Sequence, residues 1–161
     1  MNQQSSMLSN KMLTEAAEHA KKGNLEQAIT TLKELLQEAP KHEIALGMLG
    51  GIYAQIGMHD RAIQTFKQVL ELNPNNHLAR LHLGISQIET QAAAEAIDTL
   101  ETLLKLPGDF AGHYFSGIAN LHLAQPEIAH ELFEKALQTM PKDNPHYQDL
   151  LAYLENSREA G

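Results

Sequence analysis

The fold is decided by residues 46–74, which read LGMLGGIYAQIGMHDRAIQTFKQVLELNP. Apolar residues recur there every three or four positions in two series, Leu46, Leu49 and Tyr53, and then Ala62, Phe66 and Leu70. This spacing places each series on one face of a helix. Gly57 lies between the two series, where a helix that ends in a left-handed residue favours glycine. The segment therefore predicts two amphipathic helices joined as a hairpin.

The same pattern occurs four times along the chain. Alanines recur after 34, 34 and 33 residues, at Ala28, Ala62, Ala96 and Ala129. Two further series keep the same period, the large residues Leu32, Phe66, Leu100 and Phe133 and the prolines Pro40, Pro74, Pro107 and Pro141. A fixed period of this size indicates stacked supersecondary units. We therefore expect four helical hairpins, at residues 9–40, 42–74, 76–107 and 109–141.

The two ends of the chain depart from the period. Residues 1–8 precede the first unit, and we expect them to be a flexible N-terminal segment. The first unit itself carries Glu15 and His19 on its inner stripe, as an end repeat exposed on one side would. After the fourth unit, residues 142–145 interrupt the helical pattern, which then resumes at Tyr147, Leu150, Leu151 and Leu154. This predicts a ninth helix at residues 145–158 that caps the array.

Composition narrows the class of protein. The formal net charge of −8 disfavours nucleic-acid partners, because binding to phosphate backbones depends on clustered Lys and Arg. The chain has no cysteine, which argues against a small disulfide-stapled secreted fold. Residues 1–6 have neither a basic region nor an apolar core, so we expect no export signal, and no run of about 18 apolar residues could span a membrane. We expect a cytoplasmic protein with no membrane or nucleic-acid partner.

The residues that could carry chemistry favour structural roles. None of the nine histidines is spaced three or four residues from another, so we expect no metal site. Asp109, His113 and Ser116 have the composition of a hydrolase triad, but the nucleophile elbow of that class is missing. Asp109 is better placed to cap the helix that follows Gly108. No glycine-rich phosphate-binding loop occurs, and we expect no catalytic residue, no cofactor and no enzymatic activity.

The repeat resembles the tetratricopeptide repeat family, whose consensus positions are best kept by Leu46, Leu49, Gly50, Tyr53, Gly57, Ala62, Phe66 and Pro74. The resemblance covers residues 9–141. It implies an all-α fold, a right-handed α-solenoid of four hairpins, here with the capping helix added. The small residues that recur, Gly50, Gly84, Gly117, Ala62, Ala96 and Ala129, let helix backbones approach closely. We expect them to be buried together with Phe66 and Phe133.

In this family the first helices of the hairpins line a concave groove that binds peptides. Carrying that register over, the resemblance implies a partner-binding groove formed by Met48, Leu78, Leu81, His82, Ile85, Ile88, Tyr114, Phe115, Ile118, Leu121 and His122. A solvated helix face is not expected to be so apolar. The chain thus resembles bacterial tetratricopeptide adaptors and chaperones, and we expect it to bind an apolar peptide or helix of another protein.

Two alternatives to a protein partner remain open at this stage. In the first, the chain serves self-assembly, either as a homodimer or with its groove filled in cis by Met7 and Leu8 of residues 1–8. In the second, it carries an apolar small molecule, which would require a closed pocket that an open solenoid groove seldom provides.

Overall fold

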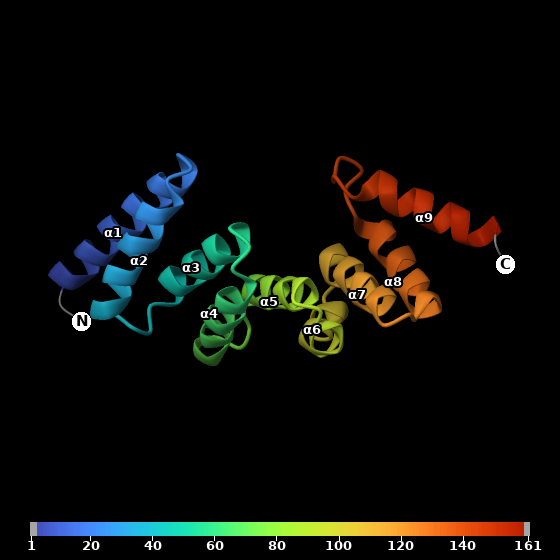
Figure 1. Ribbon diagram of the computed structural model, residues 1–161, viewed down its shortest axis with the longest axis horizontal. Coiled ribbons are helices and arrows are strands. Elements are labelled where there is room, and N and C mark those ends of the chain that lie inside the picture. The colour runs from blue at the N-terminus through green and yellow to red at the C-terminus, as the bar shows by residue number, and fades with distance from the viewer. Residues whose placement is uncertain (1–2, 160–161) are drawn as a thin grey trace. The chain divides into compact units, whose positions relative to one another are not determined.

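The computed structural model describes residues 3–159, with side chains described for residues 4–155. Within this range the chain forms nine α-helices and one short 3-10 helix, and no strand (Figure 1). The all-α expectation and the expected number of helices are confirmed. The helices belong to two compact units, Met1–Ala79 and Arg80–Gly161. Across the described helices, none combines the length and the apolar character that crossing a membrane requires.

The first unit consists of two helical hairpins. Its helices are α1 (Gln3–Lys21), α2 (Leu25–Glu38), α3 (Glu43–Gln55) and α4 (His59–Leu72). The second unit holds the remaining hairpins and the last helix. Its helices are α5 (His77–Glu89, which starts in the first unit), α6 (Ala93–Leu100), the 3-10 helix η1 (Leu103–Lys105), α7 (Phe110–His122), α8 (Pro126–Thr139) and α9 (Tyr147–Glu159).

The hairpins share one turn geometry. After α3, the Met58 N–H donates to the Tyr53 carbonyl at 2.8 Å, and Gly57 has a φ of 76°. The same left-handed conformation occurs at Gln91, with a φ of 63°, and at Ala124, with a φ of 55°. In each hairpin, the N–H of the residue after the left-handed one donates a hydrogen bond to a carbonyl of the last helical turn. This bond satisfies a carbonyl that the helix itself leaves unpaired. The turn recurs even where the glycine has been replaced.

The contact between the two helices of a hairpin depends on small residues. A Cβ atom built on Gly84 would lie 2.6 Å from Cδ2 of Leu100, and one on Gly117 would overlap the Phe133 ring. The residues expected between the helices are all buried, Ala62, Ala96, Ala129, Gly50, Gly84, Gly117, Phe66 and Phe133. The sequence register is therefore confirmed at these positions.

The third hairpin has a shortened second helix. Its second helix, α6, ends at Leu100, and the chain continues as η1. In the sequence, Pro107 follows Ala96 by 11 residues, whereas Pro74 follows Ala62 by 12. Leu103 follows Ala96 by seven residues, as Val69 follows Ala62, and both side chains are buried.

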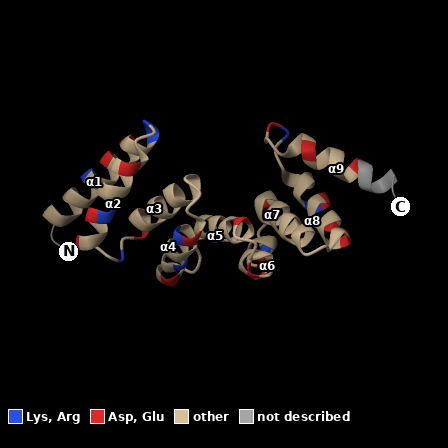
Figure 2. Ribbon diagram, in the orientation of Figure 1, with Lys and Arg blue, Asp and Glu red and all other residues tan. Residues whose placement is uncertain are grey.

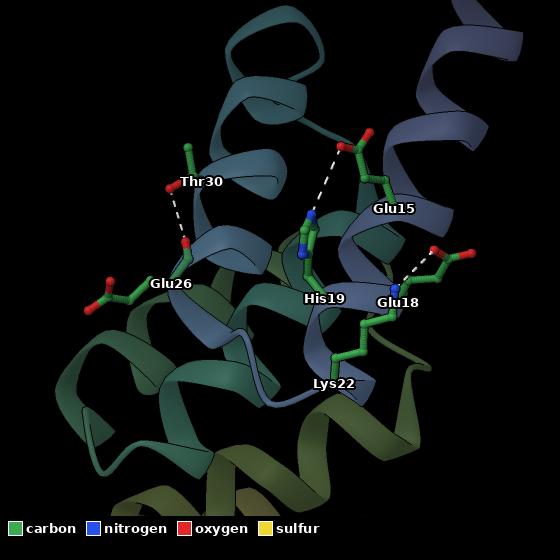
Figure 3. Close-up of polar contacts among 6 residues, drawn as sticks. All are labelled: Glu15, Glu18, His19, Lys22, Glu26 and Thr30. Atoms are coloured by element: carbon green, nitrogen blue, oxygen red, sulfur yellow. Dashed lines mark hydrogen bonds and ion pairs between the residues drawn. The ribbon is translucent and has the colours of Figure 1, made fainter.

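Most of the N-terminal segment belongs to the first helix. Residues 1–8 were expected to be flexible, but α1 begins at Gln3, and only residues 1 and 2 of that segment lie outside the described part of the chain. The Ser9 hydroxyl, which is buried, donates to the Ser5 carbonyl at 3.0 Å. Later along α1, Glu15 Oε1 lies 4.0 Å from His19 Nε2 on the helix surface (Figure 3).

The last helix has the expected capping role. Leu150 and Leu154 of α9 are 3% and 4% exposed and belong to one apolar cluster with Phe133 and Ala136 of α8. Leu137 packs against the same cluster. The end of the fourth hairpin is therefore covered by α9.

Candidate protein-binding surface

The surface expected from the sequence lies on the first helices of the hairpins. In the first unit, Met48 is partly buried and Leu78 is 65% exposed. In the second unit, α5 and α7 carry partly exposed residues at the expected positions, Leu81, His82, Ile85, Tyr114, Phe115, Ile118 and Leu121. His122, at the end of α7, is exposed. We define the binding surface of the second unit as these partly exposed residues together with His122.

Ile88 does not belong to this surface, and its assignment to the groove is corrected. Its side chain is 5% exposed and belongs to a buried cluster with Ala93, Ala96 and Ala119. The spacing from Ile85 suggested one continuous face of α5, but the residues at the end of the helix pack against α6 and α7. Ile88 is therefore a core residue.

The α7 side chains are each fixed by the core on one side. Tyr114, Ile118 and Leu121 pack against the cluster that contains Phe133 of α8. Phe115 and Ile118 pack against the cluster that contains Ile88. Because these side chains are already held, binding a partner immobilises few additional rotamers, which lowers the entropic cost of association.

Aromatic contacts fix the position of Tyr114. Its ring centroid lies 5.1 Å from that of Phe115 in an edge-to-face arrangement and 5.9 Å from that of Phe133. It also stacks on His146, 4.9 Å away and inclined by 24°. Burial, and to a smaller extent the negative charge of Asp149, raises the pKa of the Tyr114 phenol. Tyr114 thus presents a neutral, oriented ring to a partner at physiological pH.

The surface is almost free of charge. The whole of α7 contains no Lys, Arg, Asp or Glu, as the uniform tan of its ribbon in Figure 2 shows. On α5 the only such residues are Arg80 and Glu89. Burial lowers the pKa of His82, which keeps its imidazole neutral near pH 7. An apolar segment can therefore approach α7 without removing water from a charged group, a step that would oppose binding.

Sequence reasoning missed two residues of the ring cluster around Tyr114 and Phe133. His146 precedes α9, and Tyr153 lies on α9 with its ring centroid 5.1 Å from that of Phe133. The sequence pattern of α9 was assigned from Leu150 and Leu154. Tyr153 follows Leu150 by three residues, so it lies next to Leu150 on the helix surface. That spacing was the available signal. His146 carried no comparable signal in the sequence.

The described residues that were considered for a catalytic triad or a metal site are not arranged for those roles. The Asp109 carboxylate accepts a hydrogen bond from the Gly112 N–H at 3.1 Å, which confirms its role as a helix cap. His113 Nδ1 lies 2.8 Å from the carbonyl oxygen of Asp109, not from its carboxylate, and Ser116 is 1% exposed. These three residues therefore do not form a triad. Among residues 3–159, no group of three or more His, Asp or Glu is placed to hold a metal ion.

The fold and the surface together define a helical-repeat protein of the interaction or adaptor class. Two family models, each described as tetratricopeptide repeat, match residues 13–77 and 57–121, so together they span residues 13–121. The chain belongs to the tetratricopeptide repeat family, and the resemblance seen in the sequence is confirmed. No curated protein sequence matches the chain.

Solved structures show the same fold. MamA residues 41 to the end, from Desulfovibrio magneticus RS-1, superposes with a TM-score of 0.79 and 21% identity, covering 94% of this chain and 93% of that one. PilW, described as a widely conserved type IV pilus biogenesis factor, gives a TM-score of 0.80 at 21% identity, with coverages of 99% and 72%. A tetratricopeptide protein of Thermus thermophilus gives 0.73 at 18% identity, with coverages of 93% and 82%. At these identities the likeness establishes the fold alone.

Proposed function

We propose that this chain is a non-enzymatic adaptor or chaperone-like module that binds an apolar, helical or extended segment of a partner protein on the binding surface of its second unit. The observation that carries the proposal is α7, a helix with no charged residue whose large side chains Tyr114, Phe115 and Ile118 are partly exposed. Helices that place apolar side chains at a solvent surface commonly serve protein interactions. Met48 and Leu78 offer apolar side chains at the corresponding positions of the first unit.

The expected affinity is moderate. Burying a large apolar side chain contributes about 1.5 to 3 kcal/mol, and three or four such contacts fit on α5 and α7. Ordering a flexible segment and losing its free motion opposes part of this gain. We expect dissociation constants near micromolar, which correspond to a binding free energy of about −8 kcal/mol. This affinity suits a protein that binds and releases its partner reversibly.

The proposal is tested by placing a charge on the surface. Ile85→Glu should abolish partner capture while helicity and melting temperature change little, because a carboxylate at a partly exposed position stays hydrated. Partners are captured from the source cell's lysate on immobilised wild type and variant, and quantified by mass spectrometry. Ile128→Glu is the matched control, since Ile128 is 49% exposed on α8, outside the binding surface. Capture by this control should equal that of the wild type.

Two outcomes would contradict the proposal. Equal capture by wild type and Ile85→Glu would exclude α5 from binding. Unfolding of Ile85→Glu, seen by circular dichroism, would assign Ile85 to the core, and the polar second helices with Lys33, Glu34 and Lys67 would be examined next.

A second candidate function, self-assembly, has its own observation. Met7 and Leu8 on α1 are 73% and 54% exposed, so the structure does not show them filling a groove in cis. Ser5 of the same helix lines a hollow of about 730 Å³ together with Pro40 and Ile44, of which Ile44 is 62% exposed. Light scattering of the full chain and of a variant lacking residues 1–8 tests this candidate. A full chain that stays monomeric across the micromolar range would exclude it.

A further inference from the structure

The most distinctive part of the binding surface is its edge at α9, where aromatic rings gather. Tyr114, Phe115 and Tyr153 are partly exposed, and the Phe133 ring contacts both Tyr114 and Tyr153. The face of an aromatic ring carries partial negative charge and attracts Lys or Arg cations within about 6 Å. His146 stacks on one face of the Tyr114 ring, so a partner meets the parts of these rings that remain exposed.

A carboxylate follows the residue that stacks on Tyr114. Asp149 comes three residues after His146, in the first turn of α9, and is exposed. Its negative charge adds to the effect of burial in raising the pKa of the Tyr114 phenol. Within the described residues, Asp149 has no hydrogen bond or ion pair to a basic side chain. Its charge is therefore available to a group that comes from outside the chain.

The surroundings contain little positive charge to compete. α7 has no Lys or Arg, and the described side chains of α9 include two carboxylates, Asp149 and Glu155, and no base. Lys142 in the preceding loop is exposed and is followed by Asp143. The apolar surface thus ends on a carboxylate next to aromatic rings, in a chain with a formal net charge of −8.

We infer that the bound segment is basic as well as apolar, with a Lys or Arg side chain that lies against Tyr114 and faces the Asp149 carboxylate while its apolar residues cover α7. This inference rests on the proposed function and adds the charge of the partner. A cation placed there satisfies both the ring face and the carboxylate, whereas an acidic partner would meet Asp149 with like charge.

The experiment uses three synthetic peptides of about 18 residues, long enough for about five helical turns. All share one stripe of Leu and Ala, and the remaining positions are Lys, Glu or Gln. Fluorescence anisotropy of labelled peptides measures their affinities for the full chain. The Lys peptide should bind about tenfold more tightly than the Glu peptide at low salt, and the difference should shrink as salt screens the charges.

Two variants separate a local effect from the effect of net charge. Asp149→Asn should weaken the Lys peptide about three- to fivefold, the range of an exposed ion pair, and leave the Gln peptide unchanged. Asp98→Asn removes the same charge from the exposed surface of α6 and should change binding of the Lys peptide by less than about 1.5-fold. Equal effects of the two variants, or no preference for the Lys peptide, would overturn the inference.

The Gln peptide distinguishes this inference from the proposed function. If the Gln peptide binds and loses its affinity with Ile85→Glu while Asp149→Asn has no effect on the Lys peptide, the basic partner is excluded and the apolar surface stands. If none of the peptides binds, or if Ile85→Glu leaves binding of the Gln peptide intact, the proposed function and the inference both fail.

Discussion

Gly84 and Gly47 lie on equivalent types of helix but in different surroundings. A Cβ on Gly84 would meet Leu100 at 2.6 Å, whereas one on Gly47 would meet nothing within 4 Å. A methyl group forced into a packed contact shifts side chains and backbone. Gly84, one of the small residues that recur in the repeat, is therefore required by packing, whereas Gly47, which lies outside that series, is not.

Substituting alanine at these two positions should give opposite results. We expect Gly84→Ala to lower the free energy of unfolding by about 1 to 3 kcal/mol, because Leu100 is fully buried and has little room to move. Gly47→Ala should be neutral or stabilising by up to about 1 kcal/mol, because alanine favours the helix and the space is open. Urea unfolding measures both. A loss of stability in Gly47→Ala equal to that in Gly84→Ala would contradict the assignment.

Gln91 and Ala124 hold a backbone conformation that glycine adopts in the other hairpins. Their φ values of 63° and 55° are in the left-handed region, which carries an energetic penalty of about 1 to 2 kcal/mol for residues with a Cβ. Ala124→Gly should therefore stabilise the chain by about 0.5 to 1 kcal/mol, after allowing for the greater freedom of glycine in the unfolded state. Ala17→Gly, at an exposed position inside α1, should instead destabilise it by about 1 kcal/mol. Thermal melting of both variants shows whether each substitution stabilises or destabilises the chain.

At the scale of elements, a carboxylate ties the start of α3 to the turn that follows α4. The side-chain amides of Asn73 and Asn76 each donate to Glu43 Oε1 at 2.8 Å. Asn76 also accepts the Ala79 N–H at 2.9 Å, which caps α5. The hydrogen bonds from Asn76 and then Asn73 lower the pKa of Glu43. Three helices thus meet through one small polar network.

This network predicts how stability depends on pH. Because the pKa of Glu43 is lower in the folded chain than in the unfolded chain, its contribution is present above about pH 4.3 and is lost as the pH falls through the folded pKa. Glu43→Gln should be less stable than the wild type at pH 7 and should lose less stability on acidification. Urea unfolding at pH 7 and at about pH 3.5 measures the difference. Glu71 is an exposed residue of α4. If Glu43 is the responsible group, the stability of Glu71→Gln should depend on pH as that of the wild type does.

The last helix makes a second prediction at this scale. Leu150→Ala should cost about 2 to 5 kcal/mol, because the side chain is 3% exposed and its removal leaves a cavity beside Phe133. Leu123→Ala, at a position 40% exposed, should change stability by less than about 1 kcal/mol. Removing residues 146–161 should lower the melting temperature further or cause aggregation, since a domain has only about 5 to 15 kcal/mol of stability. An unchanged melting temperature after this removal would exclude the capping role.

Across the whole molecule, the repeat made the fold predictable from the sequence. Alanine, proline and large apolar residues recur with one period, so each hairpin supports the same assignment. The sequence pattern gave no sign of a break inside the third unit, whereas in the structure α6 ends at Leu100 and the chain continues as η1. Helical spacing in α1 likewise gave no sign that the polar residues before Ser9 continue the helix.

The binding surface was less predictable than the fold, for a physical reason. Periodicity places Ile85 and Ile88 on neighbouring parts of α5, yet it does not say which of them a later helix covers. Ile88 is buried by residues of α6 and α7, while Ile85 is partly exposed. The contacts of Tyr114 with His146 and Phe133 likewise join segments that are about 20 to 30 positions apart in sequence. Such contacts depend on tertiary packing, which a local pattern does not contain.

The lack of charge on α7 has a consequence for how the chain refolds. Sequences usually place charged gatekeeper residues beside apolar segments, and these slow the pairing of such segments between unfolded chains. From Phe110 to His122 no such residue interrupts the segment, so a chain that opens its second unit exposes a stretch able to associate with its copies. Heating should therefore become irreversible at high protein concentration. A ligand that covers α7 would then also reduce the self-association of the chain.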